Sequence, residues 1–156
     1  MLNKSFTRKV LSLLVLAVLV VLPACNQSTA VPEEAAPADS AGLKITGNVA
    51  EEKSWTEEEV RAMDTIEAES TNKDGEVSTY TGVPINTLLE EAGVAADAST
   101  VVFVADDGYS AEAPLADVQG CADCIVSFRN QGGFSTVLPE FSGKLQVKGV
   151  VEIQVK

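Results

Sequence analysis

Two cysteines that lie three positions apart, Cys121 and Cys124, have the clearest chemical potential in this sequence. A c-type haem attachment motif is excluded, because the residue after the second cysteine is Ile125 and the chain contains no histidine. An isolated zinc site needs four ligands, usually cysteine or histidine, so two thiols without histidine argue against zinc. Two interpretations are left for the pair, a structural disulfide or a redox-active dithiol.

The surroundings of the pair favour a disulfide in a loop. A thioredoxin-like centre places its cysteine at a helix N-terminus, where the helix dipole stabilises the thiolate. Here the residues after Cys124 read IVSF, which indicates a strand, and no βαβ pattern precedes them. Two cysteines this close also tend to be joined in an oxidising compartment. We therefore expect a local disulfide, with thiol redox chemistry as the alternative.

Residues 1–24 predict a signal peptide for export. The first ten residues carry three basic and no acidic side chains, and 13 residues that are apolar except for one serine follow at 10–22. This run is shorter than the roughly 20 residues of a membrane-spanning helix. The segment LPAC, which ends at Cys25, resembles the lipobox of bacterial lipoproteins, although Pro23 departs from its usual residue. The resemblance implies a lipid on Cys25; an ordinary cleaved signal and a retained anchor are the alternatives.

Residues 25–42 are expected to comprise the lipidated cysteine and a disordered tether. The tether is predicted because the segment is rich in Ala, Pro, Ser and Glu and lacks apolar periodicity. We therefore expect a protein of the bacterial cell envelope, outside the cytoplasm and held by its lipid at the cell membrane or the outer membrane. All 23 acidic but only eight of the 11 basic residues follow Ala24, so the mature chain would carry a net charge of −15. This charge argues against nucleic acid as a partner.

Residues 43–156 predict one compact domain of 114 residues with an α+β fold. A capping box formed by Thr56 and Glu59 begins one short helix. A second helix starts near Pro84 and ends at Gly93. Short helices among many short strands favour this class over a doubly wound parallel sheet. The expected strands lie at 43–49, 65–71, 76–80, 100–105, 110–114, 124–130, 134–139 and 149–156.

Several segments carry a family pattern in a fixed order. They read LKITGNV, SWTEEEVRAM, YTGVPINTLLEEAG, VVFVADDGYSAEAP and VLPEFSGKLQVKGVVEIQV. In this order they resemble the molybdopterin-binding domain of the sulfite oxidase type, and the Gly-Val-Pro helix with the Asp-Gly-Tyr turn is the most specific part. The resemblance covers nearly all of 43–156. It implies a mixed, partly layered β structure with short peripheral helices.

The resemblance also points to a missing metal ligand. In the enzymes of this family a cysteine upstream of the Gly-Val-Pro helix binds molybdenum, but the matching stretch at 66–80 contains no cysteine. Residues 70–72, of sequence STN, occupy the approximate place, and a hydroxyl is a poor substitute for a thiolate. The family also uses histidine and several arginines for the pterin, whereas this chain has no histidine and, after the signal, only Arg61 and Arg129. We therefore assign no catalytic residue and no metal ligand.

The cofactor stays open at this point, because the resemblance implies molybdopterin while the missing thiolate argues against molybdenum. The layout of the family places a candidate ligand pocket where the Gly-Val-Pro helix, the Asp-Gly-Tyr turn and a loop near the closing strands meet. Each candidate residue also has an ordinary structural interpretation, as a turn former, a backbone glycine or a half-buried sheet residue. The candidates are Tyr80, Thr81, Gly82, Asp106, Asp107, Gly108, Tyr109 and Arg129.

Two functions of different class follow. The first is a membrane-tethered, non-catalytic binding or accessory module of an extracytoplasmic redox system, whose partners are the membrane, through the lipid, and a redox protein. The second is a redox-active protein that uses a bound pterin cofactor or the pair Cys121 and Cys124. The sequence favours the first, because the molybdenum ligand of the family is missing.

Overall fold

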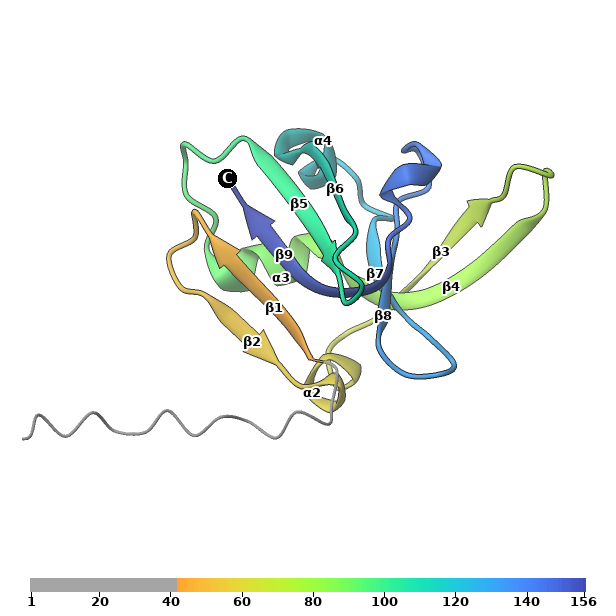
Figure 1. Cartoon of the computed structure of the whole chain (residues 1–156), viewed down its shortest axis with the longest axis horizontal. Helices are drawn as coiled ribbons and strands as arrows, with labels where there is room; N and C mark the ends of the chain where they lie inside the picture. Colours follow the sequence, from red (N-terminus) through yellow and green to blue (C-terminus); the bar gives the residue numbers. More distant parts are fainter. Residues whose placement is uncertain (1–41) are drawn as a thin grey trace, which may run out of the picture. The chain divides into compact units, whose positions relative to one another are not determined.

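The computed structural model describes residues 42–156, and the expected signal peptide, Cys25 and nearly all of the expected tether lie outside the described residues. In the described part, nine strands form one sheet accompanied by short helices, so the α+β class is confirmed (Figure 1). The strands are β1 (Leu43–Gly47), β2 (Lys53–Trp55), β3 (Ile66–Thr71), β4 (Val77–Pro84), β5 (Thr100–Ala105), β6 (Ser110–Pro114), β7 (Ile125–Phe128), β8 (Phe134–Val137) and β9 (Lys148–Val155). The helices are α2 (Glu57–Arg61), α3 (Ile85–Ala92), α4 (Leu115–Gln119) and the 3₁₀ turn η1 (Gly143–Leu145).

The long strand β9 organises the sheet. Its residues from Val150 onward pair antiparallel with β5 along one edge. Along the other edge β8 pairs with the beginning of β9, and β1 pairs in parallel with its end. On one side of β9 the sheet therefore continues through β5 to β6. On the other side it continues through β1 to β2 and, beside the beginning of β9, through β8 and β7 to β4 and β3.

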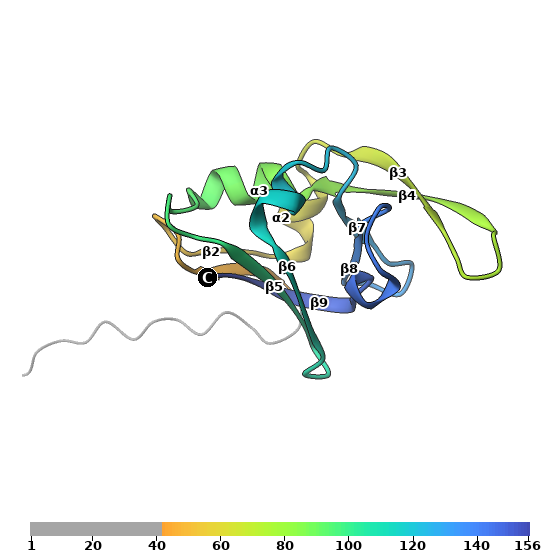
Figure 2. The ribbon, with the colours of Figure 1, turned by 90° about the horizontal axis from the view of Figure 1, so that it is seen from above.

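Helix α3 covers one face of this sheet and closes the core. Its apolar residues Ile85, Leu88 and Leu89 are buried, as their spacing predicts. The helix begins after Pro84 and ends at Gly93, whose φ of 68° is the left-handed conformation that glycine adopts without strain. Figure 2 shows α3 and α2 on the same side of the strands. Among the described residues, no helix is long and apolar enough to cross a membrane.

The strands β3 and β4 form a hairpin that projects from the rest of the described domain (Figures 1 and 2). The sequence predicts this hairpin, but β4 continues to Pro84 rather than ending at Tyr80. Gly82 to Pro84 stay extended because they pair with β7. The short strand β2, which pairs with β1, was not expected from the sequence.

Candidate functional site

Arg129 borders two hollows on the surface of the described domain. The first, of about 550 Å³, lies between the start of α2, the β5–β6 turn and the glycines of the β7–β8 turn, and we call it the Asp106 hollow. The second, of about 490 Å³, runs along β4 beside β7 and β8, and we call it the Tyr80 groove. The Asp106 hollow is lined by Glu57, Asp106, Arg129, Gln131, Gly132, Gly133, Phe134, Gly149, Val150 and Val151. The Tyr80 groove is lined by Thr79, Tyr80, Thr81, Ser127, Phe128, Arg129, Asn130 and Ser135.

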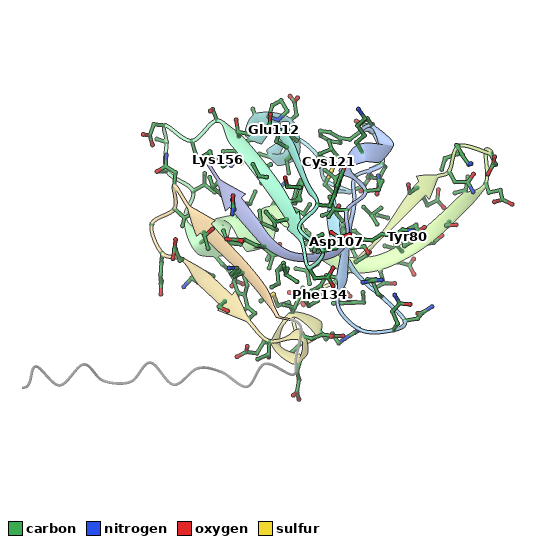
Figure 3. All side chains as sticks on the ribbon, in the orientation of Figure 1. Tyr80, Asp107, Glu112, Cys121, Phe134 and Lys156 are labelled. Atoms are coloured by element: carbon green, nitrogen blue, oxygen red, sulfur yellow. A yellow bond between two sulfur atoms is a disulfide. The ribbon has the colours of Figure 1, made fainter. Side chains whose placement is uncertain are left out.

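The eight candidate pocket residues are therefore divided. Asp106 shares the first hollow with Arg129, and Tyr80 and Thr81 share the second with the same arginine. In Figure 3, Tyr80 lies on β4 and Asp107 lies at the β5–β6 turn, on two different hairpins. The remaining four candidates line neither hollow, and they are Gly82, Asp107, Gly108 and Tyr109.

The Asp-Gly-Tyr turn is held by its own hydrogen bonds. The backbone N–H of Tyr109 donates to Asp107 Oδ1 at 2.9 Å, and Gly108 has a φ of 86°. The Tyr109 hydroxyl donates to the carbonyl oxygen of Lys144 at 2.9 Å, which fastens the hairpin to η1. The turn-forming interpretation of these residues therefore has direct geometric support.

Glu57 is the best-held charged residue at the Asp106 hollow. Its Oε2 accepts the backbone N–H of Gly133 at 2.8 Å, and its Oε1 accepts Arg61 Nε at 2.8 Å. The hydrogen bond from Gly133 and then the one from Arg61 hold the pKa of Glu57 below its ordinary value of 4.5. The guanidinium of Arg61 also lies 4.5 Å from the centroid of the Phe128 ring. Arg61 is thus paired with Glu57, while Arg129 forms no ion pair with any described residue.

We expect Glu57→Gln to lower the free energy of unfolding by about 1 kcal/mol at pH 7, because it weakens charge-assisted hydrogen bonds. A lowered folded-state pKa means that the unfolded chain takes up the proton first, so this stabilisation is present above pH 4.5 and is lost as the pH falls through the folded-state pKa. Urea unfolding between pH 7 and pH 3 measures the difference.

The control is Glu58→Gln, since Glu58 lies in the same first helical turn but is exposed. It should change stability by less than about 0.5 kcal/mol at either pH. An equal loss in both variants would contradict the role assigned to Glu57.

Residues 70–72, which the sequence resemblance places near the molybdenum ligand of the family, lie at the far end of the β3–β4 hairpin. Asn72 Oδ1 accepts the backbone N–H groups of Asp74 and Glu76, each at 2.9 Å, so this side chain builds the turn. Ser70 and Thr71 end β3, and neither lines one of the two hollows. Within residues 42–156, no three Cys, His, Asp or Glu side chains are grouped as metal ligands.

Cys121 and Cys124 form the expected disulfide in the loop between α4 and β7, with Cα atoms 5.4 Å apart. Cys124 is 1% exposed, and Cys121, labelled in Figure 3, packs partly buried against the same core. The loop follows the C-terminal end of α4, where the helix dipole disfavours a thiolate. This is the opposite of the arrangement in a thioredoxin-like centre.

The disulfide loop also positions the start of α3. The backbone N–H of Ile85 donates to the carbonyl oxygen of Cys124 at 2.9 Å. Asn86 Nδ2 donates to the carbonyl oxygen of Gln119 at 3.0 Å. These contacts favour a structural role for the pair.

The family model described as "Oxidoreductase molybdopterin binding domain" matches residues 28–156. The chain belongs to this family. Among solved structures, the sulfane dehydrogenase SoxCD from Paracoccus pantotrophus is similar, with a TM-score of 0.61 and 21% sequence identity. The similarity covers 73% of this chain and 37% of that chain, and it confirms the sulfite oxidase-like fold. No curated protein matches the chain.

The residues of this molybdopterin-binding-family domain do not fit the molybdenum cofactor that the family name implies. Arg129 is the one cation that lines the two hollows, and the Asp106 hollow also carries the carboxylates of Glu57 and Asp106, which repel a phosphate. Residues 70–72, where the resemblance would place the thiolate ligand, contain no cysteine and line neither hollow. We therefore derive no reaction step through a molybdenum centre.

Sequence reasoning missed the contact between Glu57 and Gly133 and the groove along β4. The two contacting residues are 76 positions apart, and only the fold brings them together. The sequence does show Glu57 in the first turn of a capped helix and two consecutive glycines at 132 and 133. Neither signal indicates its partner.

Proposed function

We propose that this domain is a non-catalytic binding or accessory module of an extracytoplasmic redox system. The observation that carries the proposal is the position of Ser70, Thr71 and Asn72, which end a projecting hairpin instead of lining a hollow beside Arg129. A family member without a soft ligand at that place keeps the fold but lacks the group that binds the metal.

The anchoring part of the proposal rests on the sequence of residues 1–25. A lipid on Cys25 would hold the domain at a membrane surface, with the intervening residues as a tether. The acidic composition of the mature chain suits an exported protein, and a redox partner in the same compartment is the partner that the family membership favours.

Redox chemistry at Cys121 and Cys124 is the less favoured alternative. An activated cysteine needs a positive environment that lowers its thiol pKa. Here Cys121 follows the C-terminal end of α4, Cys124 is buried among apolar side chains, and Asp123 lies between them. These features suit a stable disulfide more than a reactive one.

The test is the cofactor content of the full-length protein made in a host that synthesises molybdenum cofactor. We expect less than about one molybdenum and one pterin per ten chains, by elemental analysis and by pterin fluorescence after oxidation, because no thiolate or cation cluster holds the group. A molybdenum enzyme of known content, made in the same host, shows that the cofactor is supplied. Stoichiometric molybdenum with pterin in this protein would overturn the proposal.

The same preparation tests the anchor. We expect the wild-type protein in the membrane fraction, with a diacylglyceryl mass increment at Cys25, and we expect Cys25→Ser to lack that increment. A wild-type protein without any lipid mass would overturn the anchoring, whatever its molybdenum content.

A further inference from the structure

The strand β4 has an open edge along its first half. On one side it pairs with β3 along six residue pairs, from Val77 to Gly82. On the other side it pairs with β7 only from Gly82 to Pro84. No other described strand lies beside β4, so the edge from Val77 to Thr81 has no partner strand.

The hydrogen-bond register shows which backbone groups face this open edge. Asn72 N–H donates to Glu76 C=O in the hairpin, and Ile85 N–H donates to Cys124 C=O at the β7 end. Backbone groups alternate along an antiparallel strand, so the even-numbered residues of β4 bond to β3. The N–H and C=O groups of Val77 and Thr79 therefore point to the open side, as a template for a further strand.

The Tyr80 groove lies along this edge and gives room for such a strand. The groove is lined on one side by Thr79, Tyr80 and Thr81 and on the other by the end of β7 with Arg129 and Asn130. Tyr80 lines the groove and is 40% exposed, so its ring is available to a strand laid along this edge, whereas the exposed Val77 lies on the other face of the hairpin. Backbone groups, an apolar contact and a groove therefore coincide at one place, as in β-strand addition.

The two faces of the hairpin differ in chemistry. The strand register places Ala68, Tyr80 and Ser127 on one face. It places Glu67 opposite Thr81 and Glu69 opposite Thr79 on the other face. On the first face a strand added beside β4 would meet the ring of Tyr80 between the small side chains of Ser78 and Ser127. On the second face it would meet Val77 and the two threonines, with the carboxylates one strand further away.

The negative charge of the domain favours a basic partner segment at this edge. Residues 42–156 carry 20 acidic and eight basic side chains, so two copies of this domain would repel each other at an edge-to-edge contact. A partner segment with basic side chains at alternate positions would complement Glu67 and Glu69. Its intervening apolar side chains would lie on the other face, against Tyr80. Arg129 already supplies a positive charge beside this groove, so basic side chains of the partner are not required there.

We propose that the open edge of β4 docks an extended segment of a partner protein, in which lysine or arginine alternates with apolar residues. This proposal rests on the binding function proposed above and names the class of partner. The segment adds a strand between β4 and the β7–β8 turn. Main-chain hydrogen bonds with Val77 and Thr79 supply affinity, and Glu67, Glu69 and Tyr80 supply the preference for the alternating pattern.

The probe is a capped nine-residue peptide of alternating lysine and valine, and the matched probe replaces every lysine with glutamate. Binding to the full-length protein is measured by calorimetry and by ¹⁵N chemical shifts in mild detergent. We expect the lysine peptide to bind at least about tenfold more tightly than the glutamate peptide and to weaken with added salt. The largest shifts are expected at the amides of Val77 and Thr79.

The decisive variant is Thr79→Pro, which removes an N–H group that faces the open edge and does not bond to β3. We expect this variant to bind the lysine peptide about tenfold more weakly than the wild type. The control Thr79→Val keeps the N–H group, and we expect it to change the affinity for this peptide less than about threefold. Circular dichroism of both variants is the check that each is folded.

Three results would overturn the proposal: no binding of the lysine peptide, equal binding by both variants, or shifts confined to another surface. Self-association of the protein that Thr79→Pro abolishes would also overturn it, because a second copy would then be the occupant. Molybdenum analysis separates the two proposals, since stoichiometric cofactor with peptide binding at β4 overturns the proposed function alone.

Discussion

Replacing Gly82 with alanine is expected to destabilise the domain by at least about 3 kcal/mol or to prevent its folding. A Cβ atom at this position would lie 2.2 Å from the carbonyl oxygen of Val126 and 2.7 Å from the Cα of Ser127. Both are backbone atoms of β7, which pairs with β4 at this point, so they cannot yield without breaking the pairing. Chemical denaturation followed by circular dichroism gives the free energy of unfolding.

Gly143→Ala is the matched control, because a Cβ there meets no atom within 4 Å and its φ is not positive. It should change stability by less than about 0.5 kcal/mol. If Gly82→Ala were as stable as this control, the close approach of β4 and β7 would be wrong, and Gly82 would again be a candidate for ligand contact. A loss of several kcal/mol assigns this glycine to the sheet.

Local signals in the sequence predicted much of the fold. Thr56 and Glu59 form the capping box, in which Glu59 N–H donates to Thr56 Oγ1 and Thr56 N–H donates to Glu59 Oε2. Pro84 precedes α3 and Gly93 ends it. Each of these predictions depends on residues within about one helical turn of each other, which a sequence shows directly.

Contacts between distant segments set the rest. β4 extends past Tyr80 because β7, more than 40 residues later, pairs with Gly82 to Pro84. The short strand β2 exists because it pairs with β1, and its three residues carry no periodic pattern that could predict it.

The candidate pocket divides for a topological reason. Asp106 belongs to the β5–β6 turn, and β5 pairs with one edge of β9. Tyr80 belongs to β4, which is reached from the other edge of β9 through β8 and β7. The resemblance places both near the Gly-Val-Pro helix along the sequence, but the pairing order decides which side chains share a hollow. Among the described residues, Arg129, which directly follows β7, is the one that lines both hollows.

Loss of the disulfide is expected to cost about 2 kcal/mol of stability, the value for a loop of about four residues in the chain-entropy account. The change is Cys121→Ser combined with Cys124→Ala, which leaves a small side chain at the buried position. Urea unfolding of this variant and of the oxidised wild type gives the difference. Reductant should destabilise the wild type by a similar amount and leave the double variant unchanged, which separates the bond from side effects of the reductant.

The region in which amide exchange increases after reduction distinguishes a structural disulfide from a redox switch. The loop holds Ile85 N–H through the carbonyl of Cys124, so reduction should increase amide exchange at the start of α3 and leave the β5–β6 hairpin unchanged. A structural disulfide beside the negative end of α4 should also resist reduction by a glutathione buffer, and its reduction potential should lie below about −300 mV. A potential near −200 mV, with no loss of stability on reduction, would contradict the structural role. It would make Cys121 and Cys124 the functional centre, because a pair that opens without cost to the fold is free to exchange with a partner.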